Sequence, residues 1–214
     1  MQHQLEYVAV EGPIGVGKTT LARRLARSLK AGLVQEEAAQ NPFLNKFYRS
    51  PASVALPTQL HFLMSRRRAL RQLGQDESSR CWVSDFLWHK DRLFAELTLN
   101  EDEFNLYSEI SSELEFDLPV PDLVIYLQAP LNVLYERIEK RGIGSEQSIA
   151  SSYIARLQQA YTNFFHTYDH TPVLIVNAAE IDFDECEQDY RRLLKQILTV
   201  QAGRHYFNPS AEPA

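Results

Sequence analysis

The segment from Gly12 to Thr19, GPIGVGKT, contains the residues whose types and spacing most clearly predict chemistry. It satisfies the phosphate-binding pattern G-x-x-x-x-G-K-[ST] at every fixed position. Glycines allow a tight turn whose N–H groups point at phosphate oxygens, and a following helix adds its positive N-terminal end. The Lys18 ammonium can neutralise β- and γ-phosphates, and the Thr19 hydroxyl can bind Mg²⁺. The segment therefore predicts a nucleoside triphosphate site formed by Gly12, Pro13, Ile14, Gly15, Val16, Gly17, Lys18, Thr19 and Thr20.

Two carboxylates are expected beside this loop. Glu36 follows a short apolar run at 32–34, and Asp85 ends another at 81–85. If both runs are strands of a parallel sheet, their carboxyl ends meet at the edge where ligands bind. We therefore expect Glu36, Asp85 and the phosphate-binding loop to form one site.

The elements that must position these residues alternate along the chain. Apolar runs predict strands, and the segments between these runs have helical periodicity. This order indicates an α/β fold of three α/β/α layers around a parallel sheet of about five strands. A polar segment at 74–79 has the composition of a turn. Strands are expected at 7–10, 32–34, 81–85, 123–127 and 172–176, and helices at 20–30, 57–72, 86–99, 101–114, 132–140, 149–168 and 184–200.

Composition narrows the class of protein. The 214 residues, 44% of them hydrophobic, suffice for one substantial core, so we expect one domain at 1–200, a small lid at about 137–148 and a frayed tail at 201–214. A net charge of −6 argues against a nucleic-acid polymer as partner. Two cysteines are too few for a disulfide framework, which fits the cytoplasm. The N-terminus lacks a signal peptide's features, and no apolar run reaches membrane-spanning length.

Several classes of protein use this phosphate-binding loop, and the rest of the chain favours a small kinase. No guanine-binding NKxD motif is present, and the strand at 123–127 ends in Gln128-Ala129 where an acidic pair would mark many motor ATPases. Arg137 and Arg141 precede Gly142, as expected of a lid that closes over a triphosphate.

At this level of detail the chain resembles the deoxynucleoside kinase family, and most of all its bacterial deoxyguanosine and deoxyadenosine kinases. The ordered set of motifs is far more specific than the phosphate-binding loop alone. The resemblance rests on VEGPIGVGKTT at 10–20, NPFLNKFY at 41–48, TQLHFLMSR at 58–66, SDFLWHKDRLFAELTL at 84–99, PDLVIYLQAP at 121–130 and RIEKRG at 137–142.

The resemblance implies roles for the two carboxylates. Glu36 matches the general base that accepts the proton of the sugar 5′-hydroxyl, with Glu37 as the adjacent competitor. Asp85 matches a strand-end acid that holds Mg²⁺ or its water shell. The alternatives are a solvated loop acid for Glu36 and a helix N-cap for Asp85. The implied cofactors are ATP and Mg²⁺.

The resemblance also implies an acceptor site. Gln59, Arg66 and Asp91 match residues that read the base, where an amide and a carboxylate can pair with its edge and a guanidinium can hold the carboxylate. Tyr48 and Glu146 match residues that bind the sugar 3′-hydroxyl. The implied partners are a small-molecule deoxynucleoside and a second copy of the chain, packed through helices on one sheet face, with 86–114 as candidates.

Two positions depart from the family pattern. Ile143 replaces the second arginine of a lid that usually reads Arg-Gly-Arg, which removes one cation from the transferring phosphoryl group. Phe86 stands where many members carry arginine after the strand-end acid, and Arg92 is a possible substitute.

The leading hypothesis is ATP-dependent phosphorylation of a deoxynucleoside 5′-hydroxyl in nucleotide salvage, with deoxyadenosine or deoxyguanosine favoured. Two alternatives stay open. A nucleoside monophosphate kinase would need cations for the acceptor phosphate, which Arg66, Arg67 and Arg68 could supply. A nucleotide-binding regulator without catalysis is suggested by Ile143.

Overall fold

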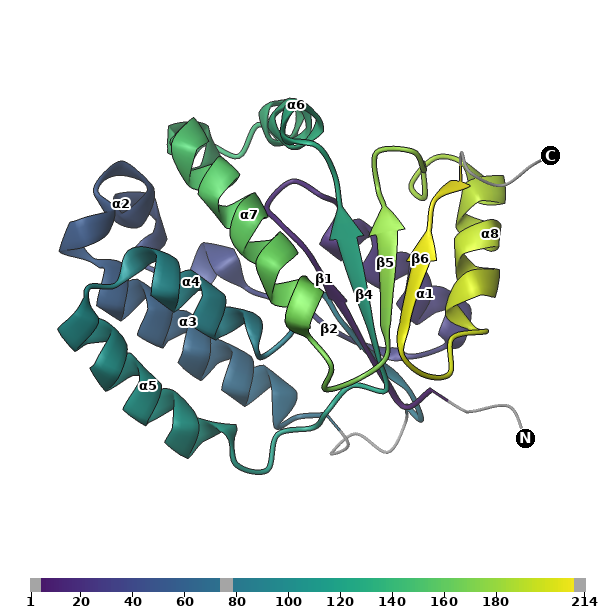
Figure 1. The fold of residues 1–214 in the computed structure, drawn as a ribbon, viewed down its shortest axis with the longest axis horizontal. Coiled ribbons are helices and arrows are strands. Elements are labelled where there is room, and N and C mark those ends of the chain that lie inside the picture. The colour runs from purple at the N-terminus through teal and green to yellow at the C-terminus, as the bar shows by residue number, and fades with distance from the viewer. Residues whose placement is uncertain (1–4, 74–78, 210–214) are drawn as a thin grey trace.

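The computed structural model describes residues 5–73 and 79–209. The first four residues, most of the turn expected at 74–79, and the last five residues of the expected tail lie outside this range. Within it, six parallel strands form one sheet in the order β2-β3-β1-β4-β5-β6 (Figure 1). The strands are β1 Tyr7–Glu11, β2 Gly32–Val34, β3 Trp82–Ser84, β4 Leu123–Gln128, β5 Val173–Asn177 and β6 Arg204–Phe207.

Helices cover both faces of this sheet, which confirms the three-layer α/β fold (Figure 1). In Figure 1, α7 crosses in front of the sheet and α1 lies behind it. The helices are α1 Lys18–Leu29, α2 Leu44–Arg49, α3 Ala55–Leu70, α4 Lys90–Thr98, α5 Glu101–Glu115, α6 Leu131–Arg141, α7 Ser151–Thr167 and α8 Glu187–Ile197, with short 3₁₀ turns at Ala38–Gln40, Pro51–Ser53 and Glu146–Ser148.

The strand β1 shows how the sequence builds two cores at once. Its side chains alternate between faces, as a period of two requires. Val8 and Val10 pack with the cluster that contains α1, α6 and α8, whereas Tyr7 and Ala9 pack with the cluster under α3, α4, α5 and α7. All five residues of β1 are buried, so the phosphate-binding loop begins on the best-covered strand of the sheet.

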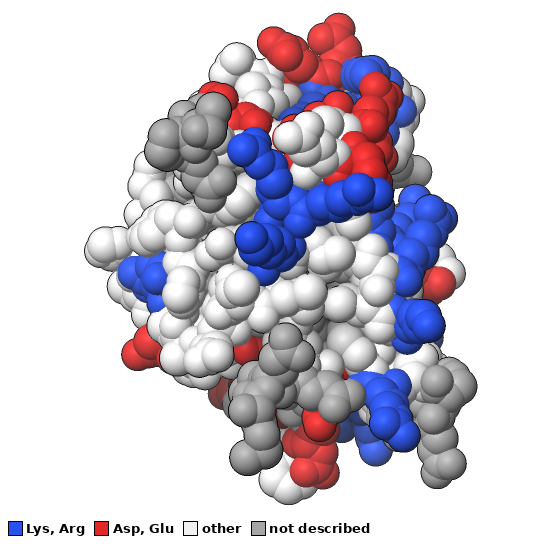
Figure 2. Space-filling view, turned by 90° about the vertical axis from the view of Figure 1, so that its right-hand side faces the viewer, with Lys and Arg blue, Asp and Glu red and all other residues white. Residues whose placement is uncertain are grey.

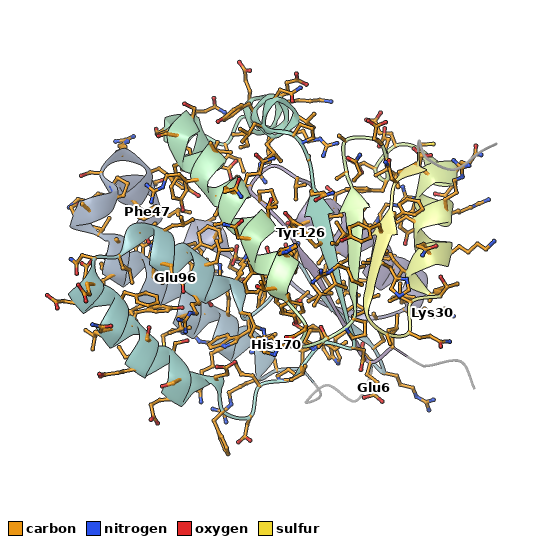
Figure 3. The ribbon with its side chains drawn as sticks, viewed as in Figure 1. Glu6, Lys30, Phe47, Glu96, Tyr126 and His170 are labelled. Atoms are coloured by element: carbon orange, nitrogen blue, oxygen red, sulfur yellow. The ribbon has the colours of Figure 1, made fainter. Side chains whose placement is uncertain are left out.

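Aromatic side chains fasten α7 to the centre of the sheet. The ring of Tyr126 on β4 stacks on Phe165 of α7 with centroids 4.1 Å apart (Figure 3). Phe47, at the left of Figure 3, belongs to a separate small cluster where α2 meets the start of α3. This third cluster anchors the segment that carries Tyr48.

The last helix packs by one face only. Figure 2 views the side of the molecule that carries α8, where Lys and Arg side chains gather with Asp and Glu above them. The inner face of α8 is apolar and its outer face is charged, as expected of an amphipathic helix. The buried residues are Tyr190, Leu193 and Ile197, and the exposed basic residues are Arg191, Arg192 and Lys195.

The expectation of a frayed tail from residue 201 was wrong for Arg204–Phe207, which form the sixth strand. They pair in parallel with β5, from Val173 opposite Arg204 to Val176 opposite Phe207. The pairing was not visible in the sequence because an edge strand needs little burial, and here only Phe207 is buried. The folded region therefore extends beyond residue 200.

The helix expected at 86–99 begins later than predicted. Residues 86–89 form a turn, and α4 starts at Lys90. Phe86 and Leu87 are buried in the core, so their apolar character reflects packing of the turn and not a helical face. None of the helices in 5–73 and 79–209 has the length and apolar character needed to cross a membrane.

Candidate active site

The phosphate-binding loop joins β1 to α1 as predicted, and its glycines are structurally required. Gly12, Gly15 and Gly17 have φ values of 152°, 83° and 106°, a region that side chains rarely adopt. A Cβ atom on Gly12 would lie 2.4 Å from the carbonyl oxygen of Leu127. The helix α1 begins directly after Gly17, so its first backbone N–H groups are available to an anion.

The Lys18 side chain lies back over the loop. Its Nζ donates to the carbonyl oxygens of Gly12 at 2.8 Å and Pro13 at 3.1 Å. Burial lowers the pKa of Lys18 to about 8, and the neighbouring Lys90 ammonium adds to this effect. A bound triphosphate would favour the charged form, so this ammonium is poised to respond to an anion.

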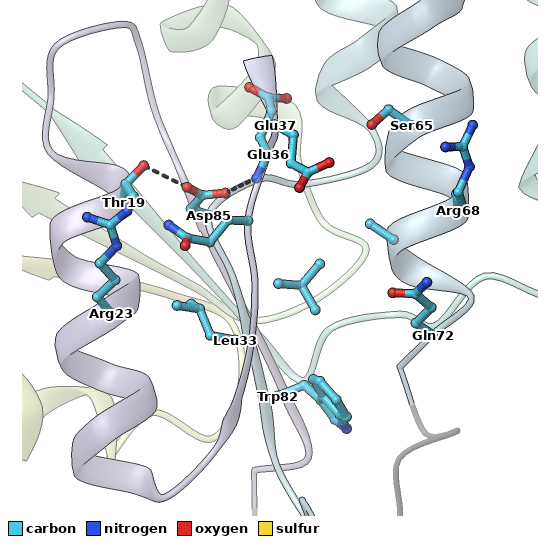
Figure 4. A pocket seen from close by; sticks show the side chains of 13 residues that line it. Thr19, Arg23, Leu33, Glu36, Glu37, Ser65, Arg68, Gln72, Trp82 and Asp85 are labelled. Atoms are coloured by element: carbon cyan, nitrogen blue, oxygen red, sulfur yellow. Dashed lines mark hydrogen bonds between the residues drawn. The ribbon is translucent and has the colours of Figure 1, made fainter. Parts of the chain in front are cut away.

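The two predicted metal-site residues are in direct contact. The Thr19 hydroxyl donates to Asp85 Oδ2 at 2.6 Å, and the Glu36 backbone N–H donates to Asp85 Oδ1 at 2.7 Å (Figure 4). Because α4 starts at Lys90, Asp85 does not cap a helix at Phe86. The strand ends of β1, β2 and β3 therefore converge as the parallel topology predicted.

The chemistry of this pair suits a hard divalent cation. Asp85 is only 4% exposed, and burial raises the pKa of its carboxyl group, while the bond from Thr19 opposes this effect. Residues 5–73 and 79–209 contain no group of three or more His, Cys, Asp or Glu side chains arranged to hold a metal. Mg²⁺ is usually held by one or two protein oxygens together with substrate phosphates, so Thr19 and Asp85 fit it.

Glu36 is held by two cations from different helices. Arg66 Nε donates to Glu36 Oε1 at 2.6 Å, and Lys90 Nζ donates to Oε2 at 3.3 Å. Burial alone would raise the pKa of Glu36, but the positive charges of Arg66, Lys90 and Lys18 outweigh it and lower the pKa to about 2. Glu36 is thus a carboxylate at neutral pH. Its neighbour Glu37 is exposed.

The structure joins two of the three residues expected to read the base. Arg66 donates through Nη1 to Asp91 Oδ1, while among the described residues Asp91 Oδ2 has no hydrogen-bond partner although it is buried. Gln59 lies two turns before Arg66 on α3, and its amide donates to the Thr98 hydroxyl at 3.2 Å. All three expected side chains are buried, and Asp91 retains a free acceptor atom.

The residues expected at the sugar and in the lid meet at one place. Arg141 forms a two-oxygen ion pair with Glu146, in which Nε lies 3.1 Å from Oε2. The helix α2, which carries Tyr48, contacts the turn Glu146–Ser148. Burial, Tyr153 and the Glu146 carboxylate raise the pKa of Tyr48. The predicted lid at 137–148 is the end of α6 followed by a turn and the 3₁₀ turn Glu146–Ser148.

The other lid arginine contacts the phosphate-binding loop. Arg137 donates to the carbonyl oxygens of Val16 at 3.1 Å and Ala178 at 2.7 Å. It borders a cavity of about 880 Å³ above the loop. Sequence reasoning missed two parts of this cavity: Lys140, which is part of the basic RIEKRG motif, and the segment 179–185 after β5, which carried no motif.

A second cavity, of about 920 Å³, lies between α1 and α3, and Thr19 lines both cavities (Figure 4). Thr19, Glu36 and Asp85 line one side of it, and Arg68 faces it from α3. Arg67 instead donates to the Leu114 carbonyl at 2.9 Å. The three consecutive arginines therefore point in different directions and do not form one phosphate-binding cluster.

The proposed substitute for the arginine missing at position 86 was wrong. Arg92 pairs with Glu96 at 2.8 Å on the outer surface, and its side chain is 68% exposed. The cation that reaches the site is Lys90, which sequence reasoning did not single out. The sequence around Lys90 did not predict that it would be buried at the site, because a lysine at the start of a helix is usually a surface residue.

Comparisons with known proteins identify the family to which the chain is similar. Residues 8–201 match the family described as deoxynucleoside kinase. Deoxyguanosine kinase of Bacillus subtilis (strain 168) is 32% identical over 197 residues, which cover 89% of this chain and 95% of the relative. Deoxyadenosine kinase of Lactobacillus acidophilus (strain ATCC 700396 / NCK56 / N2 / NCFM) is 28% identical over 207 residues, 90% of this chain and 95% of the relative.

A solved structure supports the same fold. Deoxyadenosine kinase from M. mycoides with bound dATP superposes with a TM-score of 0.76 at 22% identity, covering 90% of this chain and 98% of that chain. At this identity the likeness concerns the arrangement of the sheet and its helices.

Proposed function

The chain belongs to the deoxynucleoside kinase family, and on that premise we propose that it transfers the γ-phosphoryl group of ATP to the 5′-hydroxyl of a deoxypurine nucleoside. The observation that carries the proposal is the placement of Glu36. Its backbone is tied to Asp85, which is tied to Thr19 of the phosphate-binding loop. Arg66 and Lys90 hold the Glu36 carboxylate, and these contacts together support a base beside a phosphate bound by the loop.

In the proposed reaction, Glu36 accepts a hydrogen bond from the 5′-hydroxyl and orients it for in-line attack. The bond between the 5′-oxygen and the γ-phosphorus forms as the bond to the β-phosphate oxygen breaks, and the hydroxyl proton passes to Glu36. Lys18 and the loop N–H groups balance the charge on the phosphates. Arg137 and Arg141 supply further positive charge from the lid.

Substrate binding itself would make Glu36 a better base. Its low pKa depends in part on the positive charge of Lys18. Arg66 and Lys90 lower the pKa more than Lys18 does. A triphosphate bound to Lys18 would offset only the Lys18 contribution, and its own negative charge would raise the pKa of Glu36 further.

We propose that Thr19 and Asp85 hold Mg²⁺ or its water shell. When bound there, the cation would neutralise charge between the β- and γ-phosphates. The residues supply two oxygen ligands on rigid elements, the start of α1 and the end of β3.

Asp85→Asn is expected to raise the Mg²⁺ concentration needed for half-maximal activity by about 10- to 100-fold, the usual cost of disturbing a metal's ligands or their supports. The amide keeps the shape of the side chain but loses the negative charge. Titration of activity with Mg²⁺ at fixed ATP measures the effect, with Asp102→Asn on the exposed start of α5 as control. Equal Mg²⁺ dependence in both variants would remove Asp85 from the metal site.

Recognition of the base is assigned to Gln59, Arg66 and Asp91. Asp91 Oδ2, buried and without a partner among the described residues, can accept from an amino or ring N–H group of the base. Tyr48 and Glu146 are assigned to the sugar, where Glu146 would exchange its bond to Arg141 for one to the 3′-hydroxyl.

Asp91→Asn is expected to change the ranking of deoxynucleosides and to lower kcat/KM for the preferred one by about 10- to 100-fold, because an acceptor becomes a donor. Glu96→Gln, on the exposed side of α4, is the matched control. Initial rates with all four deoxynucleosides measure the ranking. An equal loss on every nucleoside would mean that Asp91 supports Arg66 and does not read the base.

The test of the proposed function is ADP release with Mg²⁺-ATP against the four natural deoxynucleosides and their monophosphates. We expect turnover on one or two nucleosides, purines first, and none on monophosphates. Turnover on monophosphates alone would favour the alternative of a nucleoside monophosphate kinase. The structure gives this alternative little support, because Arg66 is already bound to Glu36 and Asp91. No turnover, with ATP still bound, would favour the regulator that Ile143, 42% exposed in the lid turn, suggested.

We further propose a cytoplasmic homodimer. Leu106 lies on α5 and Phe116 directly follows it, and both are exposed apolar side chains. They belong to or adjoin the segment 86–114, whose helices are expected to carry the interface. The two free cysteines, Cys81 and Cys186, fit a reducing compartment. Sedimentation analysis at micromolar concentration measures the assembly.

A further inference from the structure

Lys90, the first residue of α4, places an ammonium group inside the protein next to two carboxylates. The residue is 2% exposed. Its Nζ lies 3.3 Å from each oxygen of Glu36 and 3.6 Å from Glu11 Oε2. A buried ammonium is retained only where it is paired, so these two carboxylates explain how Lys90 is accommodated.

Glu11 gives Lys90 a rigid anchor. This last residue of β1 is fully buried, and its Oε1 accepts from the Gly12 N–H and the Tyr161 hydroxyl, both at 2.8 Å. Its Oε2 accepts from the Leu87 N–H at 2.7 Å. Glu11 is therefore fixed to the phosphate-binding loop, to α7 and to the turn before α4.

The position of Lys90 explains how the chain can have Phe86 after its strand-end acid. Phe86 is fully buried in the apolar cluster under α3 and α7, so position 86 delivers no charge to the site. The turn at 86–89 then brings the first residue of α4 to the carboxylates. The cation at the site is therefore supplied by Lys90, four residues after position 86 in the chain.

We propose that Lys90 is the positioning residue for Glu36, linking this carboxylate through Glu11 to the phosphate-binding loop. Arg66 holds Oε1 from α3, and Lys90 bridges the carboxylate from α4. Together they fix the plane of the carboxylate and its distance from Gly12. The inference rests on the proposed function, since Lys90 acts through the proposed base.

A role confined to stability would make a different prediction. If Lys90 only neutralised Glu11, its loss would destabilise the protein whether or not Glu36 could act as a base. If Lys90 positions Glu36, its loss should matter to turnover only while Glu36 is a carboxylate. A double-mutant cycle between positions 36 and 90 separates these cases.

The experiment measures kcat and KM with radiolabelled ATP and the preferred deoxynucleoside, together with thermal unfolding. Lys90→Met removes the charge and keeps the length, and we expect kcat to fall about 10²-fold with KM for ATP little changed, the scale of a small misplacement of a catalytic group. In the Glu36→Gln background the same change should have almost no effect. Lys90→Arg should retain more activity than Lys90→Met.

Lys90→Met leaves Glu11 buried without its cation, so Glu11→Gln/Lys90→Met serves where the single variant does not fold. It removes both charges of that pair and still deprives Glu36 of Lys90, so the same loss in kcat is expected. The inference would be overturned if kcat were unchanged in the folded variant, or if the loss of Lys90 lowered kcat equally with and without the Glu36 carboxylate. The proposed kinase function would still stand in either case, provided that the wild-type protein turned over a deoxynucleoside. A wild-type protein that phosphorylated no deoxynucleoside would overturn the proposed function and this inference with it.

Discussion

Lys18→Ala is expected to lower kcat/KM for phosphoryl transfer by about 10³-fold or more, which is the scale for removing one group that stabilises charge on transferring phosphate. The reason is geometric. Lys18 is the first residue of α1, and its ammonium is already held at the mouth of the loop by Gly12 and Pro13. The charge is therefore in place before the phosphates arrive, and little reorganisation is needed.

The fold should survive this substitution. Lys18→Ala removes two hydrogen bonds to loop carbonyls, which is worth about 1–2 kcal/mol, but it also removes the need to bury an ammonium. Thermal unfolding and initial rates at saturating nucleoside test both statements, with Lys195→Ala on the exposed face of α8 as control. A kcat/KM within tenfold of the wild-type value would show that Lys18 is dispensable and that the loop binds something other than the transferred phosphate.

Glu36→Gln is expected to reduce turnover by about 10²- to 10⁴-fold, the usual contribution of a general base, and to leave ATP binding nearly intact. The amide keeps the size of the side chain and can still accept a bond from Arg66 or Lys90, but it cannot take the hydroxyl proton at neutral pH. Rates with the preferred deoxynucleoside give kcat, and equilibrium titration with a non-hydrolysable ATP analogue gives the binding constant.

The neighbouring position supplies the control. Glu37 is exposed, so Glu37→Gln should retain wild-type turnover. Should turnover survive in Glu36→Gln and be lost in Glu37→Gln, the base would be Glu37.

The pH dependence of stability offers a second check on Glu36. Because its folded pKa is lowered to about 2, its ion pairs stabilise the protein above the ordinary carboxyl pKa, and this contribution is lost as the pH falls towards 2. Glu36→Gln should flatten that part of the profile.

The parts of the site that were predictable from the sequence are those with short-range causes. The segment from Gly12 to Thr19 contains its own turn residues and directly precedes its helix, so spacing alone predicts its conformation. The meeting of Glu36 with Asp85 was also predictable, because parallel strands bring their carboxyl ends to one edge whatever the helices do.

Other features depend on packing between distant segments. The Arg66 contacts with Glu36 and Asp91 needed α3 and α4 to lie against each other, and only the family resemblance suggested part of them. The strand β6 forms because β5 offers an edge and the core accepts Phe207, two conditions that the sequence RHYF does not display.

The sequence by itself determined that this chain binds a nucleoside triphosphate at the edge of a parallel sheet, since periodicity and loop spacing are local properties. The tertiary structure alone decided which basic residue after Asp85 reaches that edge. Arg92 and Lys90 are two residues apart and look alike in sequence, yet one is exposed and the other is buried between Glu11 and Glu36. The burial of a lysine is decided by the carboxylates that the fold brings to it, and Glu11 is 79 residues away in the chain from Lys90.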